Sequence, residues 1–141
     1  MNRFVVDASI AIKWYLPENY NEEAAQLLDP RNELFAPDLL LSEIGNILWK
    51  RVIKGECSAN KAFTIMRELQ SHFLQIWGVG ILAGDAFDIA CRTKRTFYDS
   101  LYVALAVKKD CLMVTADLKL YNAIKKTSYK EYMLWVEDIS L

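Results

Sequence analysis

The chain contains few residues of the kinds that build disulfide frameworks, thiolate metal sites or histidine-based sites. Its three cysteines, Cys57, Cys91 and Cys111, are odd in number and widely spaced, and they form no Cys-x-x-Cys or Cys/His pair. This spacing argues against a disulfide framework and a zinc site, so we expect reduced, structural thiols. The single histidine, His72, has no acidic or cysteine partner at useful spacing, and we interpret it as a surface or packing residue.

Long apolar runs are missing as well. No run approaches the roughly 18–20 apolar residues that span a bilayer. The N-terminus leads straight into a short strand and lacks the basic region and the apolar stretch of about 7–15 residues that mark a signal peptide. We therefore expect a soluble, cytoplasmic protein with no membrane partner. Repeats, low-complexity tracts and linkers are also absent, so residues 1–141 are expected to form a single domain.

An excess of charge of either sign is the third absence, because 17 Lys and Arg residues face 18 Asp and Glu residues. The net charge of −1 excludes a globally cationic nucleic-acid coat. It still allows a local basic patch beside an acidic pocket. The chain is rich in apolar residues, at 53%, and 12% of its residues are aromatic. This composition predicts a globular domain with a substantial core.

Segments with strand character alternate with segments with helix character. The expected strands are 4–6, 34–36, 76–82, 111–115 and 133–136, and the expected helices are 8–16, 21–28, 37–54, 58–74, 85–94, 99–109 and 118–126. Pro17 ends the first helix, Gly55 follows the third and Ser58 caps the fourth. This alternation predicts an α/β fold with three α/β/α layers around a central, mostly parallel sheet.

Four acidic residues stand where an apolar strand or helix should carry a neutral residue. They are Asp7, Glu43, Asp99 and Asp117. Charged side chains are almost never fully buried unless they are paired or bound to a cation. Because hard oxygen ligands suit hard ions, the simplest shared explanation is a divalent cation, magnesium or manganese.

Two of these acids follow predicted strands. Asp7 comes directly after strand 4–6, and Asp117 comes two residues after strand 111–115. Ligands of open parallel sheets bind at the carboxyl ends of the strands, so the two carboxylates should converge if their strands are parallel neighbours. Ser9 and Thr115 lie beside them and could orient waters or phosphate oxygens. Local capping of the next helix is the alternative for each of these residues.

The other two acids belong to predicted helices. Glu43 falls inside the apolar face of helix 37–54 at about 100° per residue, although it could lie at the margin and pair with Lys50 or Arg51. Asp99 opens a helix that is apolar nearly all round and is therefore expected to be central to the fold. Alone, Asp99 could simply cap that helix and complement its dipole. The joint occurrence of all four acids favours one metal pocket.

The residues around the four acids resemble the acidic motifs of PIN-domain ribonucleases. The segments are Val-Val-Asp-Ala-Ser (5–9), Leu-Leu-Ser-Glu-Ile (40–44), Tyr-Asp-Ser-Leu-Tyr-Val-Ala-Leu-Ala (98–106) and Val-Thr-Ala-Asp (114–117). Their order and spacing are similar to those of the VapC-type toxins of VapBC toxin–antitoxin pairs, over essentially the whole chain. Lys13-Trp14 and Pro17-Glu18 also resemble a common opening of that family. The resemblance implies a PIN-like fold and a single PIN-like nuclease domain.

The resemblance further implies a metal-dependent endoribonuclease with Mg²⁺ (or Mn²⁺) as its cofactor. Asp7 and Asp99 are expected to be direct metal ligands, and Glu43 and Asp117 to complete the pocket, hold metal-bound waters or help a second ion. Phosphodiester cleavage needs an activated water and a sink for negative charge, and a carboxylate-held cation supplies both. Because clustered carboxylates repel one another, at least one should have a raised pKa without metal.

An RNA substrate calls for cations around this acidic pocket. The candidates for such a rim are Arg92, Lys94 and Arg95, with Lys13 and Lys119 as weaker ones; the alternative is a solvated helix end. Tyr98, Tyr102 and Trp14 could stack on bases or belong to the core. VapC-type resemblance also implies a small VapB-type antitoxin partner that inserts into the active-site groove, and a homodimer. Composition shows neither.

Two other functions stay open at this point. A haloacid-dehalogenase-type phosphatase also places an aspartate after its first strand, but its mechanism requires Asp-x-Asp, where this chain has Asp7-Ala8-Ser9. A non-catalytic PIN-like module would keep the fold and bind RNA or a protein without cutting. The intact set of four acids disfavours such a module.

Overall fold

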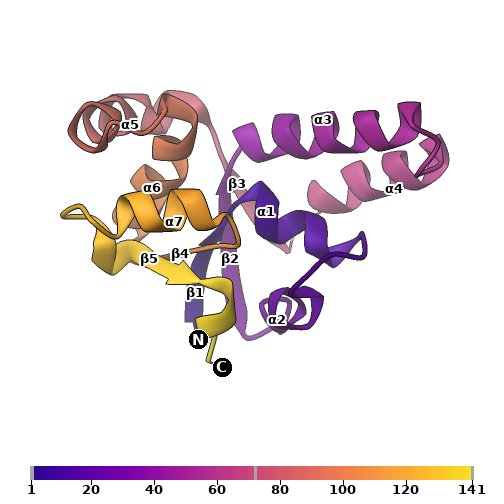
Figure 1. The fold of residues 1–141 in the computed structure, drawn as a ribbon, viewed down its shortest axis with the longest axis horizontal. Helices are drawn as coiled ribbons and strands as arrows, with labels where there is room; N and C mark the ends of the chain where they lie inside the picture. The colour runs from indigo at the N-terminus through magenta and orange to yellow at the C-terminus, as the bar shows by residue number, and fades with distance from the viewer. Residues whose placement is uncertain (1, 72, 141) are drawn as a thin grey trace.

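The structure, a computed structural model, describes residues 2–71 and 73–140, so the interpretation of His72 lies outside it. Over this part of the chain, five strands form one sheet in the order β3-β2-β1-β4-β5 (Figure 1). The strands are β1 (Asn2–Val6), β2 (Asn32–Pro37), β3 (Leu74–Trp77), β4 (Leu112–Thr115) and β5 (Met133–Trp135). All four strand pairings are parallel, which confirms the predicted α/β class.

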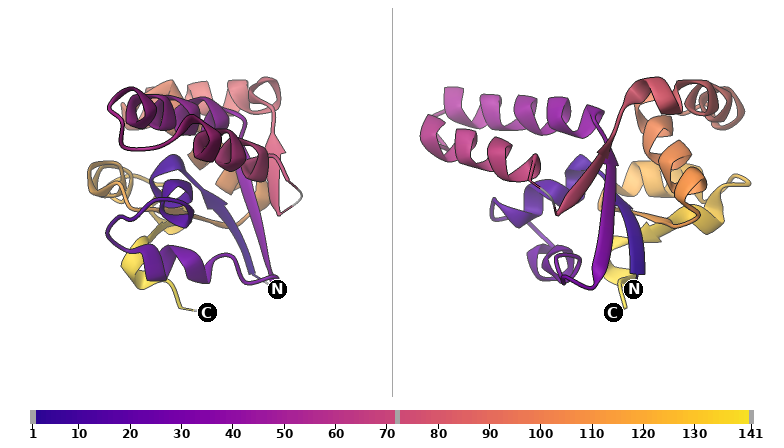
Figure 2. Two further views of the ribbon diagram at one scale, coloured as in Figure 1. Left: turned by 90° about the vertical axis from the view of Figure 1, so that its right-hand side faces the viewer. Right: turned by 180° about the vertical axis from the view of Figure 1, so that it is seen from behind.

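Helices connect the strands and cover both faces of the sheet. They are α1 (Ala8–Ala11), α2 (Asn21–Gln26), α3 (Leu39–Ile53), α4 (Ala59–Leu69), α5 (Val79–Thr93), α6 (Phe97–Lys109) and α7 (Leu118–Ile124), with 3₁₀ turns at Ile12–Trp14, Lys130–Tyr132 and Val136–Asp138. Figure 2 shows β1 and β2 between α2, α3 and α4 on one side and α5 and α6 on the other. The predicted three-layer arrangement is therefore confirmed.

The central helix is α6, as its apolar sequence predicted. Seven consecutive residues from Ser100 to Ala106 are buried, because α6 packs against β1, β2 and β4 on one side and against α5 on another. The strands below it are apolar on both faces, with Val5, Val6 and Phe35 fully buried. Such two-sided burial is typical of parallel sheets. The core thus holds the N-terminal turn of α6 close to the ends of β1 and β4.

Local signals explain most helix boundaries. The Ser58 hydroxyl accepts from the backbone N–H of Lys61 at 3.1 Å, so Ser58 is the predicted cap of α4. Gly55 follows α3 with φ of 75°, a left-handed conformation that glycine adopts readily after a helix. The Thr96 hydroxyl caps α6 by accepting from the N–H of Asp99 at 3.1 Å. That cap starts α6 at Phe97, two residues before the predicted start.

The predicted strand 76–82 is wrong in its second half. The strand β3 ends at Trp77, and residues 79–82 form the first turn of α5. Leu82, Ala86 and Ile89 are buried at helical spacing, so burial of one helix face decides the conformation of this segment. A short apolar run does not distinguish a buried strand from the start of a helix.

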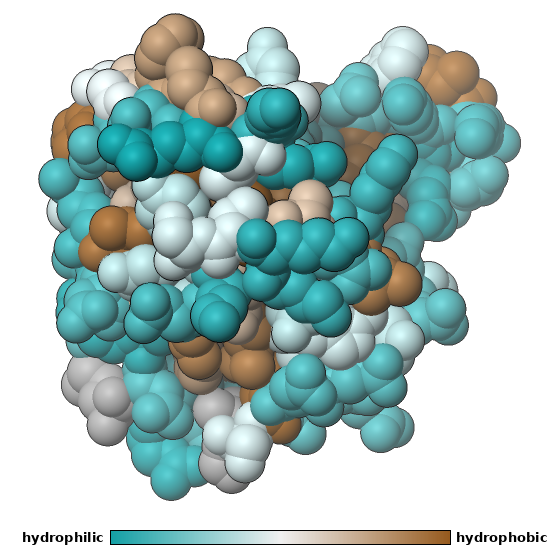
Figure 3. All heavy atoms as spheres, turned by 60° about the vertical axis from the view of Figure 1, so that its left-hand side comes forward, coloured by the Kyte–Doolittle hydropathy of each residue, from teal (hydrophilic) through white to brown (hydrophobic). Residues whose placement is uncertain are grey.

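The surface shown in Figure 3 is mostly polar. Separate apolar spots lie on this largely hydrophilic face. Large exposed apolar residues occur on α3 and α4, where Trp49, Ile53 and Phe63 are 58%, 69% and 65% exposed. Within the described residues, no helix combines the length and apolarity that crossing a membrane requires.

Candidate active site

The topological switch point of the sheet lies between the neighbouring strands β1 and β4. Two of the four acids follow the ends of these strands. β1 connects to β2 on one side, whereas β4 lies on its other side, and Val6 stands opposite Val114 in the register. Asp7 and Thr115, the next residues on the two strands, therefore lie side by side at the carboxyl edge of the sheet. Crevices at such switch points are where open parallel sheets bind ligands.

Asp7 is held on both carboxylate oxygens. Oδ1 accepts from the Ser9 hydroxyl at 2.6 Å and from the backbone N–H of Ile10 at 3.2 Å, so Asp7 also caps α1. Oδ2 accepts from the Thr115 hydroxyl at 2.5 Å. The capping expected as an alternative role is thus real, but it leaves the carboxylate tied to the neighbouring strand.

Burial changes the acidity of Asp7. The residue is only 6% exposed. Loss of solvent raises the pKa of its carboxyl from 3.8 to about 6, and the negative charge of Asp117 adds to that rise. The hydrogen bonds from Ser9, Thr115 and Ile10 oppose the rise without cancelling it. Asp7 thus has a raised pKa without metal, as expected for at least one of the four acids, and burial rather than charge repulsion is the main cause.

Asp117 shares its support with Asp7. Its backbone N–H donates to the Thr115 hydroxyl oxygen at 3.0 Å, and its Oδ1 caps α7 by accepting from the N–H of Leu120 at 3.2 Å. The Ser9 hydroxyl oxygen accepts from the N–H of Ala116 at 2.9 Å. Ser9 and Thr115 thus join the two strand ends, and we name Asp7 and Asp117 the strand-end pair.

Glu43 and Asp99, which we name the helix pair, come from α3 and α6. The Tyr102 hydroxyl donates to Glu43 Oε1 across the two helices. Burial raises the pKa of Glu43, the charge of Asp99 adds to the rise, and the Tyr102 bond opposes it. The suggested pairing of Glu43 with Arg51 is absent from the ion pairs of the described residues, where Arg51 binds Glu18 and Glu56.

The sequence did not predict that Tyr102 binds one of the four acids. Tyr102 is 2% exposed, which places its ring in the core and rules out base stacking. Burial raises the pKa of its hydroxyl, and the charges of Glu43, Asp7 and Asp99 raise it further. The hydroxyl therefore stays protonated and stands between the two pairs. A signal was available, because Tyr102 lies three residues after Asp99 and so on the same side of α6.

Charge effects connect the four acids in pairs rather than around one common point. The negative charge of Asp117 raises the pKa of Asp7, and that of Asp99 raises the pKa of Glu43. The charges of three of the four acids raise the pKa of Tyr102. Over residues 2–71 and 73–140, no three His, Cys, Asp or Glu side chains are already arranged to hold a single ion. The donor set consists of carboxylate and hydroxyl oxygens, which suits a hard divalent cation that keeps part of its water.

The cations expected at the rim are differently placed. Arg95 Nη2 contacts Asp99 Oδ2 at 3.0 Å inside the site. Arg92 is exposed and binds Asp88 one turn earlier on α5, at 2.9 Å. Lys94 is exposed at the C-terminal cap of α5. Arg92 and Lys94 are thus exposed cations, of which Arg92 is paired with an exposed acid.

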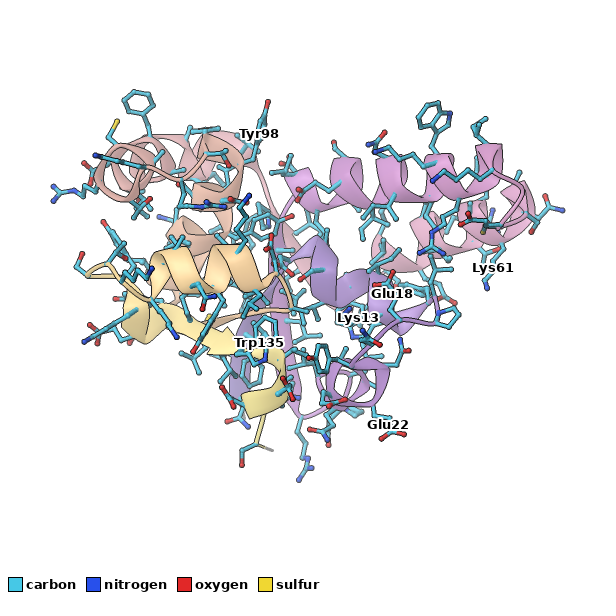
Figure 4. All side chains as sticks on the ribbon, in the orientation of Figure 1. Lys13, Glu18, Glu22, Lys61, Tyr98 and Trp135 are labelled. Atoms are coloured by element: carbon cyan, nitrogen blue, oxygen red, sulfur yellow. The ribbon has the colours of Figure 1, made fainter. Side chains whose placement is uncertain are left out.

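Lys13 is not an exposed cation. Its side chain is 8% exposed, and Nζ contacts Glu18 Oε1 at 3.3 Å, as the neighbouring labels in Figure 4 show. Glu18 also binds Arg51 of α3 at 3.2 Å. Lys13 and Glu18 therefore join the segment after α1 to α3 in the structure.

The three aromatic candidates separate clearly. Tyr102 is in the core, and Trp14 is half-buried with its Nε1 donating to the Ala24 carbonyl at 2.9 Å. Tyr98 is 61% exposed and projects from the first turn of α6, next to Asp99 (Figure 4). Its ring packs against Phe97 with centroids 6.5 Å apart. Tyr98 is thus the aromatic residue of the three that a base can reach.

An all-parallel sheet with acids at its switch point and on two flanking helices is the arrangement that the sequence motifs predicted. The chain matches the PIN domain family over residues 4–126. It therefore belongs to the PIN domain family, and the haloacid-dehalogenase alternative is wrong.

One protein of known name and two solved structures are similar to this chain. Ribonuclease VapC3 of Pyrobaculum aerophilum is 34% identical over 120 residues, which cover 84% of this chain and 92% of the relative. The crystal structure of PAE2754 from the same organism superposes with a TM-score of 0.69 at 22% identity, covering 96% of this chain and 85% of the other. A toxin–antitoxin complex from Klebsiella pneumoniae superposes with a TM-score of 0.62 at 15% identity, covering 96% and 98%. The two structural likenesses support the same fold.

Proposed function

We propose that this chain is a metal-dependent endoribonuclease of the VapC type, built as a single nuclease domain. The observation that carries the proposal is the pair of carboxylates that follow β1 and β4 at the switch point of the sheet, together with two from α3 and α6 whose charges, like that of Asp7, act on the Tyr102 hydroxyl. The relative named Ribonuclease VapC3 supports RNA as the substrate. A non-catalytic module would have no need for this set of acids, whose negative charges raise one another's pKa values.

The donor set fits Mg²⁺ or Mn²⁺. Asp7 and Asp99 are the proposed direct ligands, and Glu43 and Asp117 hold metal-bound waters or help a second ion. The rise in the pKa of Asp7 to about 6 supports this assignment, because a cation would offset the desolvation of its charged form. A bound cation supplies an activated water and a sink for the charge that develops on the phosphate.

The chain's own groups orient this site. The hydroxyls of Ser9 and Thr115 hold both oxygens of Asp7 in one orientation. The Tyr102 hydroxyl holds Oε1 of Glu43 and leaves Oε2 for a water or a substrate group. The raised pKa of Glu43 brings it closer to neutral pH, where a general base works best. Glu43 is therefore the proposed group for orienting or deprotonating the attacking water.

RNA is proposed to reach the site along the start of α6. Arg92 and Lys94 supply positive charge to the phosphates, and the exposed ring of Tyr98 offers a base one residue from Asp99 a stacking surface. Stacking is tolerant of sequence, so this surface provides affinity more than base specificity.

A small VapB-type antitoxin and a second copy of the chain are the proposed protein partners, in the cytoplasm. The fold is shared with a toxin–antitoxin complex from Klebsiella pneumoniae. Exposed Trp49 and Ile53 on α3 and Phe63 on α4 are large apolar side chains of the kind that protein interfaces cover. Size-exclusion chromatography with light scattering, alone and with the product of a neighbouring short reading frame, tests both partners.

The proposed activity is tested with purified protein and a labelled RNA that has single-stranded and loop regions. Cleavage is expected with Mg²⁺ or Mn²⁺ and not in chelator. Asp7→Asn and Asp99→Asn are each expected to lower the rate by at least about a thousandfold, since they remove ligands of the group that activates water. Asp85→Asn, which changes an exposed acid on α5, is the matched control and should cleave normally. Undiminished cleavage in chelator, or in both ligand variants, contradicts the proposal.

A further inference from the structure

We propose that Arg95 is an internal counter-ion of Asp99 that competes with the divalent cation for this carboxylate. The inference rests on the proposed function, because it takes Asp99 to be a metal ligand. Arg95 acts through Asp99, so it is a positioning residue. Its removal should make metal binding tighter, which is the opposite of what a supporting residue would do.

The contact itself is direct and shielded. Arg95 precedes α6 and Asp99 lies in its first turn, four residues later, with Nη2 and Oδ2 3.0 Å apart. The two side chains are only 24% and 26% exposed. Water and salt screen such a pair less than one on the open surface. Among the ion pairs of the described residues, this one alone engages any of the four candidate acids.

Two of the other cations considered for the rim have acidic partners outside the four acids. Arg92 binds Asp88 on the outside of α5, and Lys13 binds Glu18 next to α3. Asp99 lies close enough to Glu43 to raise the pKa of that residue. Arg95 therefore stands at the place where the helix pair needs positive charge when no metal is present.

The hydrogen bonding of Arg95 is incomplete. Its Nε is buried and has no partner among the described residues. An arginine often binds a carboxylate through two parallel hydrogen bonds, but here one nitrogen makes the contact and the buried donor remains unmet. Leaving a buried donor unpaired is unfavourable. The guanidinium is thus held mainly by charge, in a position from which a cation of higher charge can displace it.

Mutual exclusion follows from these contacts. The Asp99 oxygen that Arg95 occupies is not free to bind a metal ion, and two cations on one carboxylate repel each other. Metal binding therefore includes the cost of separating Arg95 from Asp99, and a variant without this pair does not carry that cost. By linkage, the metal must weaken the Arg95 contact as much as the contact weakens metal binding.

The test measures Mn²⁺ binding to the metal-free full chain by isothermal titration calorimetry, without RNA. Arg95→Gln is expected to lower the Mn²⁺ dissociation constant by about three- to tenfold, the range for a partly shielded ion pair. Arg92→Gln removes the same charge from a pair that touches none of the four acids, and its dissociation constant should stay within about twofold of the unmodified chain.

Arg95→Lys keeps the charge but lacks the planar fork of arginine. It is expected to tighten Mn²⁺ binding by about twofold, which is less than Arg95→Gln does. If circular dichroism shows that Arg95→Gln does not fold, Arg95→Lys is the variant that tests the inference. Weaker Mn²⁺ binding in either Arg95 variant would show a supporting role and overturn the inference. Equal tightening in Arg92→Gln and Arg95→Gln would show a general charge effect and overturn it as well.

Asp99→Asn separates this inference from the proposed function. If Asp99→Asn leaves Mn²⁺ binding unchanged, Asp99 is no ligand, and the metal site fails together with the role of Arg95. If Asp99→Asn weakens binding while Arg95→Gln does not tighten it, the metal site stands and the counter-ion inference alone is overturned.

Discussion

The strand-end pair and the helix pair carry the same formal charge, yet the protein surrounds them with different groups. Asp7 is buried among hydroxyls and backbone N–H groups, which orient it without compensating its charge. Glu43 and Asp99 are partly buried and receive a phenol and a guanidinium. The comparison indicates that the strand-end pair, through Asp7, is the more extensively hydrogen-bonded half and lacks a cation, whereas the helix pair carries a substitute for one.

The largest expected effect concerns the stability of the strand-end half. The pKa of Asp7 is about 6 in the folded protein against an ordinary value of 3.8, so the folded protein binds more protons between these values. Stability contributed by protonated Asp7 is fully present below about pH 3.8 and is lost as the pH rises through about 6. The upper limit of the loss in unfolding free energy is about 3 kcal/mol in metal-free protein.

Urea unfolding of the metal-free chain and of Asp7→Asn, compared from pH 4 to pH 8, measures this loss. The difference in unfolding free energy between the two proteins should change across that window in favour of the variant, because asparagine has no charge to desolvate. Saturating Mn²⁺ should stabilise the unmodified chain more than the variant. A pH-independent difference would contradict the assignment of a raised pKa to Asp7.

The next effect breaks the hydroxyl support of the strand-end half. Thr115→Val removes the donor to Asp7 Oδ2 and the acceptor for the N–H of Asp117. Because a hydrogen bond to a charged group contributes about 1.5–3 kcal/mol, Mn²⁺ binding and kcat/KM should each fall by about tenfold or more. Calorimetry and single-turnover cleavage measure the two. Thr64→Val is the control, because its hydroxyl on exposed α4 donates to the Asn60 carbonyl and accepts from Arg67, away from the site.

The matching change in the helix half sharpens the comparison. Tyr102→Phe removes the donor to Glu43, which is half-buried and keeps access to water. A loss of about threefold in kcat/KM is expected, the range for one partly exposed hydrogen bond, with little change in Mn²⁺ affinity. If Tyr102→Phe impairs metal binding more than Thr115→Val does, the hydrogen bonds to Asp7 are not the main support of the metal site.

The last prediction lies outside both pairs, at the proposed stacking surface. Tyr98→Ala should lower kcat/KM for single-stranded RNA by about five- to tenfold, the lower part of the range for one stacked base, and Tyr98→Phe should be close to normal. Phe87→Ala removes a similarly exposed ring from α5 and should have no effect. An RNA with an abasic nucleotide next to the cut should abolish the difference between Tyr98 and alanine. An equal loss in both alanine variants would contradict stacking at Tyr98.

The sequence predicted the placement of the acids on strands and helices better than it predicted their hydrogen-bond and ion-pair partners. Asp7 and Asp117 could be brought together because strand ends of a parallel sheet share one edge. Glu43 could be placed by helical periodicity, and its half-buried position agrees with that placement. Both rules depend on the backbone alone, and the backbone here follows its local propensities.

The partners depend on side chains from distant segments, and no periodicity predicts them. Tyr102 lies 59 residues from Glu43, and its hydroxyl reaches Glu43 because α3 and α6 approach each other in the fold. Lys13 was expected at the rim but is neutralised by Glu18. Arg95 was expected to face RNA, whereas its spacing of four residues from Asp99 allows a pair on the same side of α6. That spacing was the overlooked signal.

The central claim is that the two pairs form one divalent-cation pocket, and direct Mn²⁺ binding tests it. Calorimetry on the metal-free chain, on Asp7→Asn from the strand-end pair and on Asp99→Asn from the helix pair compares the two halves, with Asp88→Asn as the control. We predict that both pocket variants weaken Mn²⁺ binding by at least about tenfold, as the loss of a direct carboxylate ligand requires, while Asp88→Asn binds normally. Unchanged Mn²⁺ binding in either pocket variant would contradict a single shared pocket.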